Sequence, residues 1–549
     1  MSRLQLNDSD LLRQQALFAG RWQDGHQGAT LPVNDPSTGE TLATIPALGR
    51  AETEQAIACA ESVRISWGRT THASRAALLE KWHQLMLDHA DDLAMIMTAE
   101  QGKPLAEARG EVLYGASFVK WFAEEARRIY GDTIPAPSDD RRILVLKQPV
   151  GVAAAITPWN FPIAMITRKV APALAAGCPI IVKPSELTPL SALALAVLAE
   201  RAGFPPGVLQ MLTGLPEEIG ETLTRSQTVR KISFTGSTRI GQLLMQQSAN
   251  SLKRLSLELG GNAPMIVFDD ADIEIAVAGV MLSKFRNAGQ TCVCANRILV
   301  QRNIYPRFTE RLLEAVATLK VGDGFAPGST IGPLINARAV EKVKGHIDDA
   351  LSQGATLLTG GISQERGTFV QPTVLGDVTV KMRIAHEETF GPVAPLFIFD
   401  EEEEAIAMAN DTPYGLAAYF FTENIRRGWR VAEALEAGMV GFNTGAVSLE
   451  VAPFGGVKHS GLGREGSRYG IEDLVYHYGK HGNQKHLKQK AVTLFMSRVV
   501  SRKPLHEKRP VDHINKGQKN KGRNSTRKSS QSSTHRSVND PVAFIGKDL

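Results

Sequence analysis

The strongest indication of the fold is the run Gly151-Val152-Ala153-Ala154-Ala155-Ile156-Thr157-Pro158-Trp159-Asn160-Phe161-Pro162. It begins as an apolar segment of strand length and ends abruptly in prolines, aromatic residues and one amide. A helix over residues 164–176, a strand over 180–182 and a second helix over 189–202 are predicted to follow. This alternation predicts a parallel sheet. Because ligands bind beyond the carboxyl ends of such strands, Asn160 is a candidate site residue.

A second strand-to-helix turn lies further along the chain. A strand over residues 231–235 runs into Gly236 and Ser237 and then into a helix over 242–249. Backbone N–H groups and the dipole at a helix start can hold a phosphate. The glycine spacing is not the Gly-x-Gly-x-x-Gly fingerprint of dinucleotide sites, so an ordinary turn explains these residues equally well.

The rest of the chain continues the α/β pattern. Further helices are predicted over residues 50–130, 305–319, 340–353 and 405–410, and further strands over 143–146, 255–259 and 297–300. Read by themselves, Glu258 is most simply a solvated charge at a strand end, and Glu387 and Glu388 are most simply surface charges. With 549 residues, the chain is expected to form two or three domains.

A glycine-rich segment around two cysteines is the candidate nucleophile loop. The segment is Phe285-Arg286-Asn287-Ala288-Gly289-Gln290-Thr291-Cys292-Val293-Cys294. Small and polar residues there keep a sulfur accessible, as a nucleophile requires. The other two cysteines, Cys59 and Cys178, lie among apolar residues and are expected to be small buried side chains. An unreactive thiol is the alternative for Cys292 itself.

Composition and charge describe a globular protein with an unusual C-terminus. Hydrophobic residues make up 43% and charged residues 22% of the chain, no run is apolar enough for a membrane helix, and residues 1–15 do not read as a secretory signal. A cytoplasmic location is therefore expected. Residues 474–549 hold 17 Lys/Arg against 4 Asp/Glu, whereas residues 1–473 hold 45 against 53. Any argument for a nucleic acid or an acidic membrane concerns only the tail.

Together these residues predict an oxidation through a covalent adduct. A thiol can add to an aldehyde carbonyl, N–H donors can hold the resulting oxyanion, and a dinucleotide can take the hydride. A carboxylate must then activate water to hydrolyse the thioester. Each step finds one candidate in this chain, and no metal-ligand cluster competes with them.

Seven motifs in this order resemble the aldehyde dehydrogenases. They cover about residues 15–473 and read Pro158-Trp159-Asn160-Phe161-Pro162, Lys183-Pro184-Ser185-Glu186, Phe234-Thr235-Gly236-Ser237, Leu257-Glu258-Leu259-Gly260-Gly261, Gly289-Gln290-Thr291-Cys292, Glu387-Glu388-Thr389-Phe390-Gly391-Pro392 and Pro453-Phe454-Gly455-Gly456. Each motif is weak alone, but their joint occurrence is very specific. The resemblance implies an α/β fold with a Rossmann-type cofactor domain, an α/β catalytic domain and a small β oligomerisation element.

The resemblance also implies roles for individual residues. Cys292 would be the nucleophile and Glu258 the general base, and Asn160 would form the oxyanion hole with the Cys292 backbone N–H. Residues implied to bind the cofactor are Trp159, Lys183, Ser185, Glu186, Gly236, Ser237, Glu388 and Phe390. The implied domains are 1–131 with 151–260 for the cofactor, 261–459 for catalysis, and 132–150 with 460–479 for oligomerisation.

Within the family, residues 284–297 are similar to succinate-semialdehyde dehydrogenases. Arg168, Arg286 and Ser448 resemble that subgroup's clamp for the substrate carboxylate, and cationic donors suit such a group. The alternative is that the two arginines are ordinary surface or structural side chains. Glutarate semialdehyde would satisfy the same clamp, since one methylene is usually worth only about 1–3 kcal/mol of discrimination.

The cofactor is expected to be NAD or NADP, with NAD preferred. At the ribose position, Glu186 should accept hydrogen bonds from a free 2′-hydroxyl and repel a 2′-phosphate.

Cys294 suggests a second hypothesis, a disulfide with Cys292 that inactivates the enzyme under oxidation. In this respect the chain resembles some members of the subgroup. So small a ring is strained, and a spectator thiol is the alternative.

The family pattern ends at Asp473. Residues 474–479 are expected to supply at most a short edge strand. Residues 480–549 have a composition that cannot bury a core and are expected to be disordered, either as an accidental tail from a shifted reading frame or as a tail for nucleic acid or membrane. The family's homodimer or homotetramer is therefore in doubt, although a small-molecule aldehyde remains the expected partner. The alternatives to this enzyme are an acylating or hydrolytic thiol enzyme and a non-catalytic scaffold.

Overall fold

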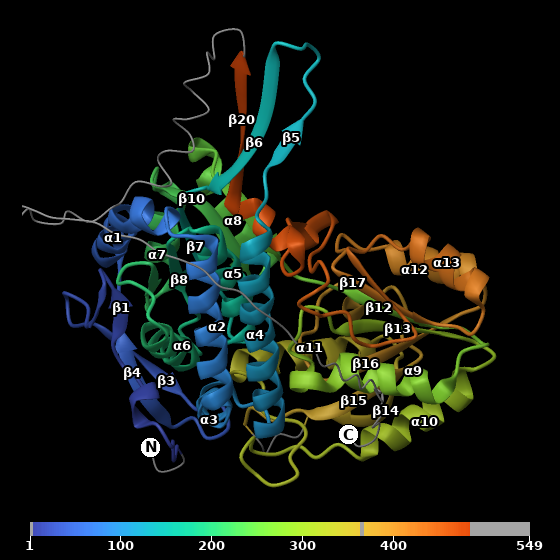
Figure 1. Ribbon diagram of the computed structural model, residues 1–549. Coiled ribbons are helices and arrows are strands. Elements are labelled where there is room, and N and C mark those ends of the chain that lie inside the picture. The colour runs from blue at the N-terminus through green and yellow to red at the C-terminus, as the bar shows by residue number, and fades with distance from the viewer. Residues whose placement is uncertain (1–3, 363–366, 484–549) are drawn as a thin grey trace, which may run out of the picture. The chain divides into compact units, whose positions relative to one another are not determined.

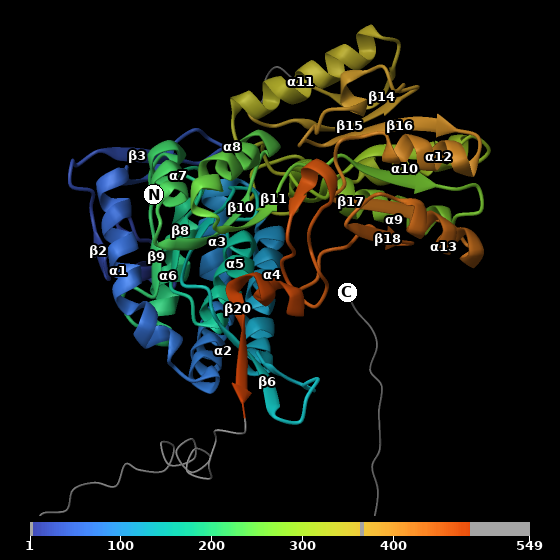
Figure 2. The ribbon, with the colours of Figure 1, turned by 90° about the horizontal axis from the view of Figure 1, so that it is seen from above.

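The computed structural model describes residues 4–362 and 367–483. The predictions made for the basic tail after residue 483 lie outside these residues. Figures 1 and 2 show two sheets, each with its own helices, and a smaller sheet beside the first. Among the described helices, none is long and apolar enough to cross a bilayer.

The first sheet has eight strands in the order β19-β11-β10-β7-β8-β9-β1-β2. Strands β7 to β11 pair in parallel, and β1 and β19 join antiparallel at either side. Every residue of β7 is buried, as expected for a strand covered on both faces. The bounds are β1 Ala16–Phe18, β2 Arg21–Gln23, β7 Val152–Ile156, β8 Ile180–Lys183, β9 Leu209–Met211, β10 Val229–Thr235, β11 Arg254–Glu258 and β19 Gly461–Leu462.

Eight helices accompany this sheet, and the two predicted helices between β7 and β9 are confirmed to the residue. They are α1 Arg50–Gly68, α2 His72–Asp88, α3 Ala90–Gln101, α4 Leu105–Glu125, α5 Ala164–Ala176, α6 Pro189–Ala202, α7 Pro216–Arg225 and α8 Thr238–Ser248. Helix α5 stops at Gly177, which has φ +93°, and α6 starts with proline in its first turn. Helix α8 starts four residues earlier than predicted, directly after Ser237, because Thr238 to Gly241 form its first turn rather than the loop.

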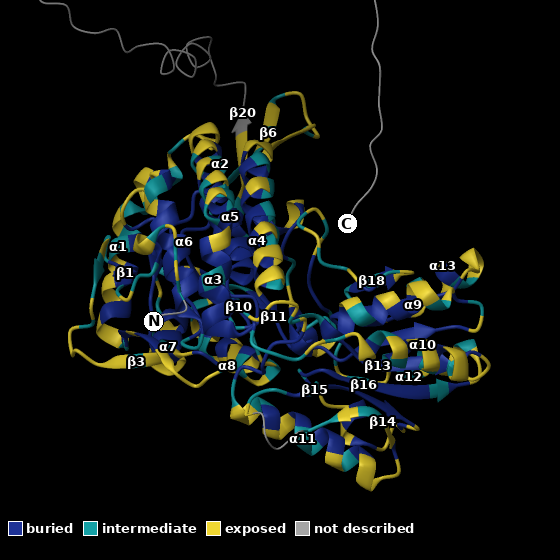
Figure 3. Ribbon diagram, turned by 90° about the horizontal axis from the view of Figure 1, so that it is seen from below, coloured by how far each residue is buried: buried dark blue, intermediate teal, exposed yellow. Residues whose placement is uncertain are grey.

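The second sheet has seven strands in the order β14-β15-β16-β13-β12-β17-β18. Its strands are β12 Ala263–Val267, β13 Ala295–Gln301, β14 Thr356–Gly361, β15 Gln371–Gly376, β16 Val393–Phe399, β17 Ala417–Phe421 and β18 Met439–Phe442. Its helices are α9 Ile273–Val280, α10 Tyr305–Ala317, α11 Ala337–Ser352, α12 Glu402–Asn410 and α13 Ile425–Ala434. The inner strands are buried while the outer faces of the helices are exposed (Figure 3).

A third sheet, in the order β20-β6-β5, consists of β5 Asp132–Ile134, β6 Arg141–Pro149 and β20 Val475–Asn483. The edge strand predicted within residues 474–479 is confirmed by β20, which pairs antiparallel with β6 from Val475↔Pro149 to Asn483↔Arg141. Its length was underestimated, and the prediction of disorder from residue 480 was wrong for residues 480–483, which belong to this strand. Likewise, β6 extends at both ends beyond the strand predicted over residues 143–146. Both faces of β6 are largely accessible, so polar residues at its ends do not prevent pairing. A separate hairpin joins β3 Thr30–Asn34 to β4 Thr41–Pro46.

The segment predicted as one C-terminal return, residues 460–479, divides between two sheets. Strand β19 pairs with β11 of the first sheet, and the chain joins the third sheet only from Val475 onward. Between the two strands, the Asp473 carboxylate accepts hydrogen bonds from Lys231 Nζ at 3.1 Å and Ser256 Oγ at 2.6 Å. These contacts fix the end of the family-like sequence to β10 and β11.

Candidate active site

The loop before Cys292 is held in an unusual backbone conformation. A π-helical turn over Met281–Phe285 follows α9, and Asn287, Ala288 and Gly289 then have φ values of +52°, +54° and +72°. A Cβ atom on Gly289 would lie 2.2 Å from the Gly391 carbonyl oxygen, so only glycine fits there. This loop places Cys292 in the wall of a cavity, with its side chain partly exposed.

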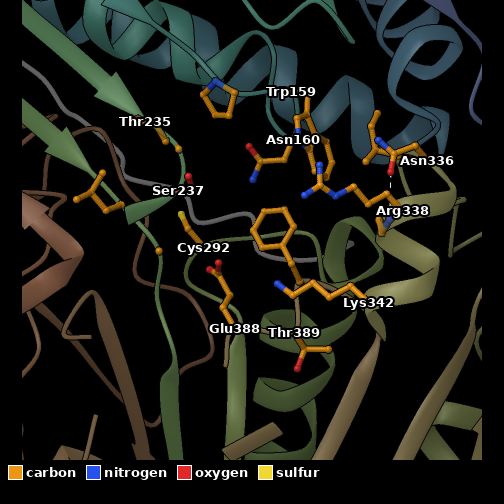
Figure 4. A pocket seen from close by; sticks show the side chains of 17 residues that line it. Trp159, Asn160, Thr235, Ser237, Cys292, Asn336, Arg338, Lys342, Glu388 and Thr389 are labelled. Carbon is orange, nitrogen blue, oxygen red and sulfur yellow. Dashed lines mark hydrogen bonds between the residues drawn. The ribbon is translucent and has the colours of Figure 1, made fainter. Parts of the chain in front are cut away.

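A cavity of about 500 Å³ opens beside Cys292. Figure 4 shows Asn160 and Glu388 on either side of this thiol and the basic side chains Arg338 and Lys342 across the cavity from it. Of the residues predicted to act in catalysis or cofactor binding, those that line the cavity are Trp159, Asn160, Gly236, Ser237, Cys292, Glu388 and Phe390. The structure therefore brings the predicted thiol, amide and phosphate-binding turn to one space.

Asn160 is held from both sides. Its Nδ2 donates to the Gln290 carbonyl at 3.0 Å, which leaves its second amide hydrogen free. Its own carbonyl accepts hydrogen bonds from Lys103 Nζ at 2.8 Å and from Asn287 Nδ2 at 2.9 Å. These bonds fix the backbone that carries the predicted oxyanion donor.

Two buried residues that sequence reasoning missed support this arrangement. Lys103 Nζ pairs with Glu111 Oε2 at 2.5 Å, and Glu111 Oε1 accepts the N–H groups of Ile163 and Ala164 at the start of α5. Both members of the pair are almost completely buried. In the sequence, Lys103 lies just before α4 and Glu111 lies 8 positions later on that helix, and nothing local linked the pair to Asn160.

Glu258 is not the solvated charge that its sequence context favours. It ends β11, is buried, and neither carboxylate oxygen has a hydrogen-bond partner in the described part of the chain. Burial raises the pKa of Glu258 well above its ordinary value, Glu465 raises it further, and Arg168 and Lys169 oppose both effects. A buried carboxyl without partners and with a raised pKa is poised to exchange a proton.

Lys169 and Glu465 form a second group that the sequence analysis did not find. Glu465 accepts ion pairs from both Arg168 and Lys169, and Lys169 Nζ also donates to Thr235 Oγ1 at 2.6 Å. Thr235 lines the cavity. The charges around Glu258 are thus connected to the cavity wall through buried side chains from α5, β10 and the turn after β19.

Burial raises the pKa of the Cys292 thiol to about 12, partly opposed by Arg168 and increased further by Glu388 and Glu258. The resting protein therefore holds a protonated thiol. The backbone N–H of Cys292 donates to no other residue in the described ranges, so it remains available to a bound oxyanion. Two adjacent donors, this N–H and the Asn160 amide, can serve one oxygen.

The predicted substrate clamp has mixed surroundings. Arg168 is buried on α5, where it pairs with Glu465 and lies 3.8 Å above the Phe454 ring, yet its Nη2 has no partner among the described residues. Arg286 is half-buried, with its guanidinium 4.8 Å from the centre of the Phe161 ring, and Ser448 is half-buried too. Arg168 thus makes structural contacts and also has one nitrogen without a partner, so its role in a substrate clamp stays a prediction.

The residues predicted to bind the adenosine part of the cofactor lie at the carboxyl end of β8. Lys183 Nζ, buried, donates to Glu186 Oε2 at 2.6 Å, and Ser185 Oγ accepts the Leu187 N–H at 3.2 Å. None of these three residues lines the cavity beside Cys292. Glu186 is about one-third exposed, with its side chain available to a bound sugar.

Glu388, predicted to bind the cofactor, is not the surface charge that its position next to Glu387 suggested. Glu388 lines the cavity and accepts the Gly261 N–H at 3.1 Å, and burial raises the pKa of its carboxyl to about 7. Glu387 instead pairs with Arg383 on the surface. Trp159 and Phe390 meet edge to face with ring centres 5.5 Å apart.

The start of α8 fits a phosphate. Ser237, at the helix N-cap, makes no side-chain capping hydrogen bond, and a Cβ on Gly236 would lie 2.5 Å from the Phe234 ring. The first N–H groups of the helix are therefore free to bind an anion. Arg338 and Lys342, which the sequence analysis missed, add positive charge to the same cavity.

Cys292 and Cys294 are both free thiols. Cys294 is buried, and its sulfur donates to the Lys284 carbonyl at 3.6 Å. The predicted disulfide between them stays a prediction. In the described part of the chain no group of three or more His, Cys, Asp or Glu side chains could hold a metal ion.

Residues 22–477 match the family model described as "Aldehyde dehydrogenase family". The chain is 58% identical over 472 residues to a glutarate-semialdehyde dehydrogenase of Pseudomonas putida strain KT2440, covering 86% of this chain and 98% of that protein. It is also 58% identical over 473 residues to the succinate-semialdehyde dehydrogenase [NADP(+)] of Escherichia coli K12, with coverage of 86% and 98%. A crystal structure of succinate-semialdehyde dehydrogenase from Burkholderia pseudomallei matches with a TM-score of 0.87 and 58% identity, over 87% of this chain and 100% of that one.

Proposed function

The chain belongs to the aldehyde dehydrogenase family, and from that premise we propose that it oxidises succinate semialdehyde to succinate with NAD or NADP. The observation that carries this proposal is the cavity in which Cys292 meets both Asn160 and the free N-terminus of α8. A nucleophile, an oxyanion donor and an anion site in one space are what oxidation through a thioester requires. Relatives named for glutarate and for succinate semialdehyde are equally similar to the chain.

The residues around the cavity suit a dinucleotide. Gly236 and Ser237 at the start of α8 would hold the pyrophosphate, Lys183 and Glu186 the adenosine ribose, and Glu388 the nicotinamide ribose. When bound, NAD or NADP supplies the acceptor for the hydride. Trp159 and Phe390 would form walls of the cofactor site, and Ser185 would lie in the turn beside the adenosine ribose.

Cys292 begins the reaction by adding its sulfur to the aldehyde carbonyl carbon. The free amide hydrogen of Asn160 and the Cys292 N–H then donate to the oxygen as it becomes negative. One such donor is typically worth about 2.7–4 kcal/mol of barrier. Since the thiol is protonated at rest, its proton must leave during this step, and the acceptor that we propose is the unpartnered Glu258 carboxylate, whose charge acts on this thiol.

Glu258 acts again when the thioester is hydrolysed, after it has passed the thiol proton on to solvent. In its ionised form it takes a proton from water, which then attacks the acyl carbon. The buried cations Arg168 and Lys169 favour this ionised form, whereas burial and Glu465 oppose it. The balance keeps the carboxyl a stronger base than an ordinary glutamate while its ionised form remains accessible.

The far end of the substrate would meet Arg168, Arg286 and Ser448. The unpartnered Nη2 of Arg168 and the half-buried guanidinium of Arg286 offer two positive donors for a carboxylate. Hydrogen bonds to charged groups are worth about 1.5–3 kcal/mol each. We therefore expect aldehydes with a terminal carboxylate to be preferred over neutral ones.

The direct test is the formation of NADH or NADPH by the purified full-length protein with succinate semialdehyde, glutarate semialdehyde and propanal. We expect kcat/KM for the semialdehydes to exceed that for propanal by about 100-fold, equivalent to ~2.7 kcal/mol of carboxylate recognition. Equal rates with all three aldehydes would disprove the carboxylate specificity. No turnover with any of them would disprove the proposed activity.

Glu186 should set the preference for NAD over NADP. Replacement of Glu186 by glutamine keeps the size of the side chain and removes the charge next to Lys183, from which it lies 2.6 Å. We expect the ratio of kcat/KM for NAD to that for NADP to fall about tenfold, because repulsion of a 2′-phosphate is lost. Initial rates with both cofactors measure it, and an unchanged ratio would exclude this explanation. Glu387→Gln, which alters an exposed acid of the surface, is the matched control.

We also propose a cytoplasmic protein that forms a homodimer or homotetramer. A reactive thiol and four unpaired cysteines suit a reducing compartment. Among the described residues, no strand pairs with the outer edge of β20, and such an edge can pair with another copy. Light scattering of the full-length chain would determine the number of subunits.

A further inference from the structure

A buried tyrosine hydroxyl without a partner lies close to the proposed substrate end. Tyr114 projects from α4, and its ring packs against Phe161, Ala164 and Met165. It also meets Phe118 edge to face, with ring centres 5.0 Å apart. The hydroxyl oxygen is covered from solvent and no described residue meets it with hydrogen-bond geometry, although the Ser448 side chain approaches it closely enough to lower the pKa of the phenol. Such an uncompensated polar group destabilises a fold, so its presence needs an explanation.

The surroundings of this hydroxyl belong to the substrate side of the site. Burial raises the pKa of Tyr114, and the charges of Arg168 and Arg286 and the hydroxyl of Ser448 partly oppose this rise. Cys292 is near enough to act on the same group. Tyr114 is thus a neutral phenol, which can donate one hydrogen bond. Its ring and the Arg168 guanidinium both contact the Phe118 ring, at 5.0 and 5.9 Å from its centre.

A second unpartnered donor shares this region. The Nη2 of Arg168, like the Tyr114 hydroxyl, is buried and makes no hydrogen bond to any described residue. Phe161 connects the two sides, since its ring packs against Tyr114 and lies 4.8 Å from the Arg286 guanidinium. An anionic oxygen bound between the Tyr114 hydroxyl and Arg168 Nη2 would accept a hydrogen bond from each, so that neither buried donor would remain unpaired.

Packing alone does not account for the hydroxyl. A phenylalanine at position 114 would make the same ring contacts with Phe161, Met165 and Phe118, without the buried oxygen. A buried site that is built to donate a hydrogen bond discriminates strongly against ligands that lack the acceptor. The hydroxyl is therefore explained by a ligand acceptor rather than by the core.

We propose that the Tyr114 hydroxyl donates a hydrogen bond to the terminal carboxylate of the substrate and is a specificity residue alongside Arg168, Arg286 and Ser448. This inference rests on the proposed function, because it requires an aldehyde with an anionic far end. It adds a neutral donor from α4 to a clamp whose other members come from α5, the thiol loop and the segment after β18.

The test is the variant Tyr114→Phe, assayed with succinate semialdehyde and with propanal. We expect the KM for succinate semialdehyde to rise about tenfold, equivalent to ~1.4 kcal/mol, while the KM for propanal stays the same. The kcat with either substrate should change less than twofold, since the reacting atoms are not touched. Competitive inhibition by succinate should weaken by the same factor as the KM rises, which provides a binding readout independent of turnover.

The matched control is Trp121→Phe. Trp121 lies on the same helix, and its buried Nε1 also lacks a partner among the described residues. Unlike Tyr114, it has no recorded interaction with Arg168, Arg286 or Ser448. This variant should leave the KM for succinate semialdehyde unchanged. The melting temperature of Tyr114→Phe should equal or exceed that of the parent, because the change removes a buried unpaired hydroxyl.

Two results would overturn the proposal, and they differ from failure of the proposed function. An unchanged KM for succinate semialdehyde in Tyr114→Phe, with a parent enzyme that prefers this substrate over propanal, would exclude Tyr114 alone. A tenfold rise for propanal as well would show that the hydroxyl shapes the pocket rather than binding the carboxylate. A parent enzyme that does not distinguish the two aldehydes would overturn the proposed function itself, and the role of Tyr114 with it.

Discussion

Replacement of Cys292 by alanine is expected to lower kcat/KM for aldehyde oxidation by a factor on the order of 10⁴ or more, since no other group can form the thioester. The thiol lies in the cavity wall between Asn160 and Glu388, and no second cysteine reaches that cavity. Cofactor reduction followed at 340 nm would measure the loss. Intact-protein mass of samples quenched with acid during turnover should show an acyl adduct on the parent enzyme and none on the variant.

The control for this experiment is Cys294→Ala. Cys294 is two residues away, buried, and bonded through its sulfur to the Lys284 carbonyl. It should therefore keep most of the activity if the loop folds normally. Substantial activity in Cys292→Ala, together with an acyl adduct at another residue, would show that the nucleophile had been misassigned.

Replacement of Glu258 by glutamine is expected to stop the reaction after the first half. Acylation should still release a burst of about one reduced cofactor per active subunit, but the burst should be slower because Glu258 no longer accepts the thiol proton. Steady turnover should fall about 10²–10⁴-fold, because the water is no longer activated. Rapid mixing with succinate semialdehyde would show the burst. A variant with normal steady turnover would exclude Glu258 as the base that releases the acid.

The same residue predicts a pH dependence. Burial, and then Glu465, raise the pKa of Glu258, and only the ionised carboxylate can accept a proton. Below this raised pKa the group is protonated and hydrolysis is slow, whereas above it hydrolysis reaches its full rate. The steady rate of the parent enzyme should thus rise with pH through a transition above the ordinary range of glutamate, and Glu258→Gln should lack that transition.

Local patterns in the sequence predicted some elements closely and failed at others for identifiable reasons. The bounds of α5 and α6 were predicted to the residue because glycine and proline mark their ends. The start of α8 was missed because Thr238 to Gly241 resemble a loop in composition but form the first turn of the helix. Strand β20 was underestimated because its partner, β6, lies more than 300 positions earlier, and a pairing of that kind has no local signal.

The site shows the same division. Asn160, Gly236 and Cys292 could be singled out because each follows a strand or lies in a small-residue turn. For Glu258 and Glu388, charge next to glycine suggested a surface position, whereas both are buried at the site. Only resemblance to the family pointed to their roles. Pairs such as Lys103–Glu111 and Lys169–Glu465 depend on contacts between distant segments and leave no periodic pattern to read.

The left-handed turn before the thiol also bears on how the protein reaches its active form. Left-handed backbone costs roughly 1–2 kcal/mol for each residue other than glycine, and Asn287 and Ala288 are adjacent in that conformation. Local preference therefore opposes the loop, and the contacts that hold it come from Gln101, Glu107 and Asn160, more than 100 positions away. We expect the loop to form only after those segments have assembled, so that during refolding the helices return first and enzymatic activity last.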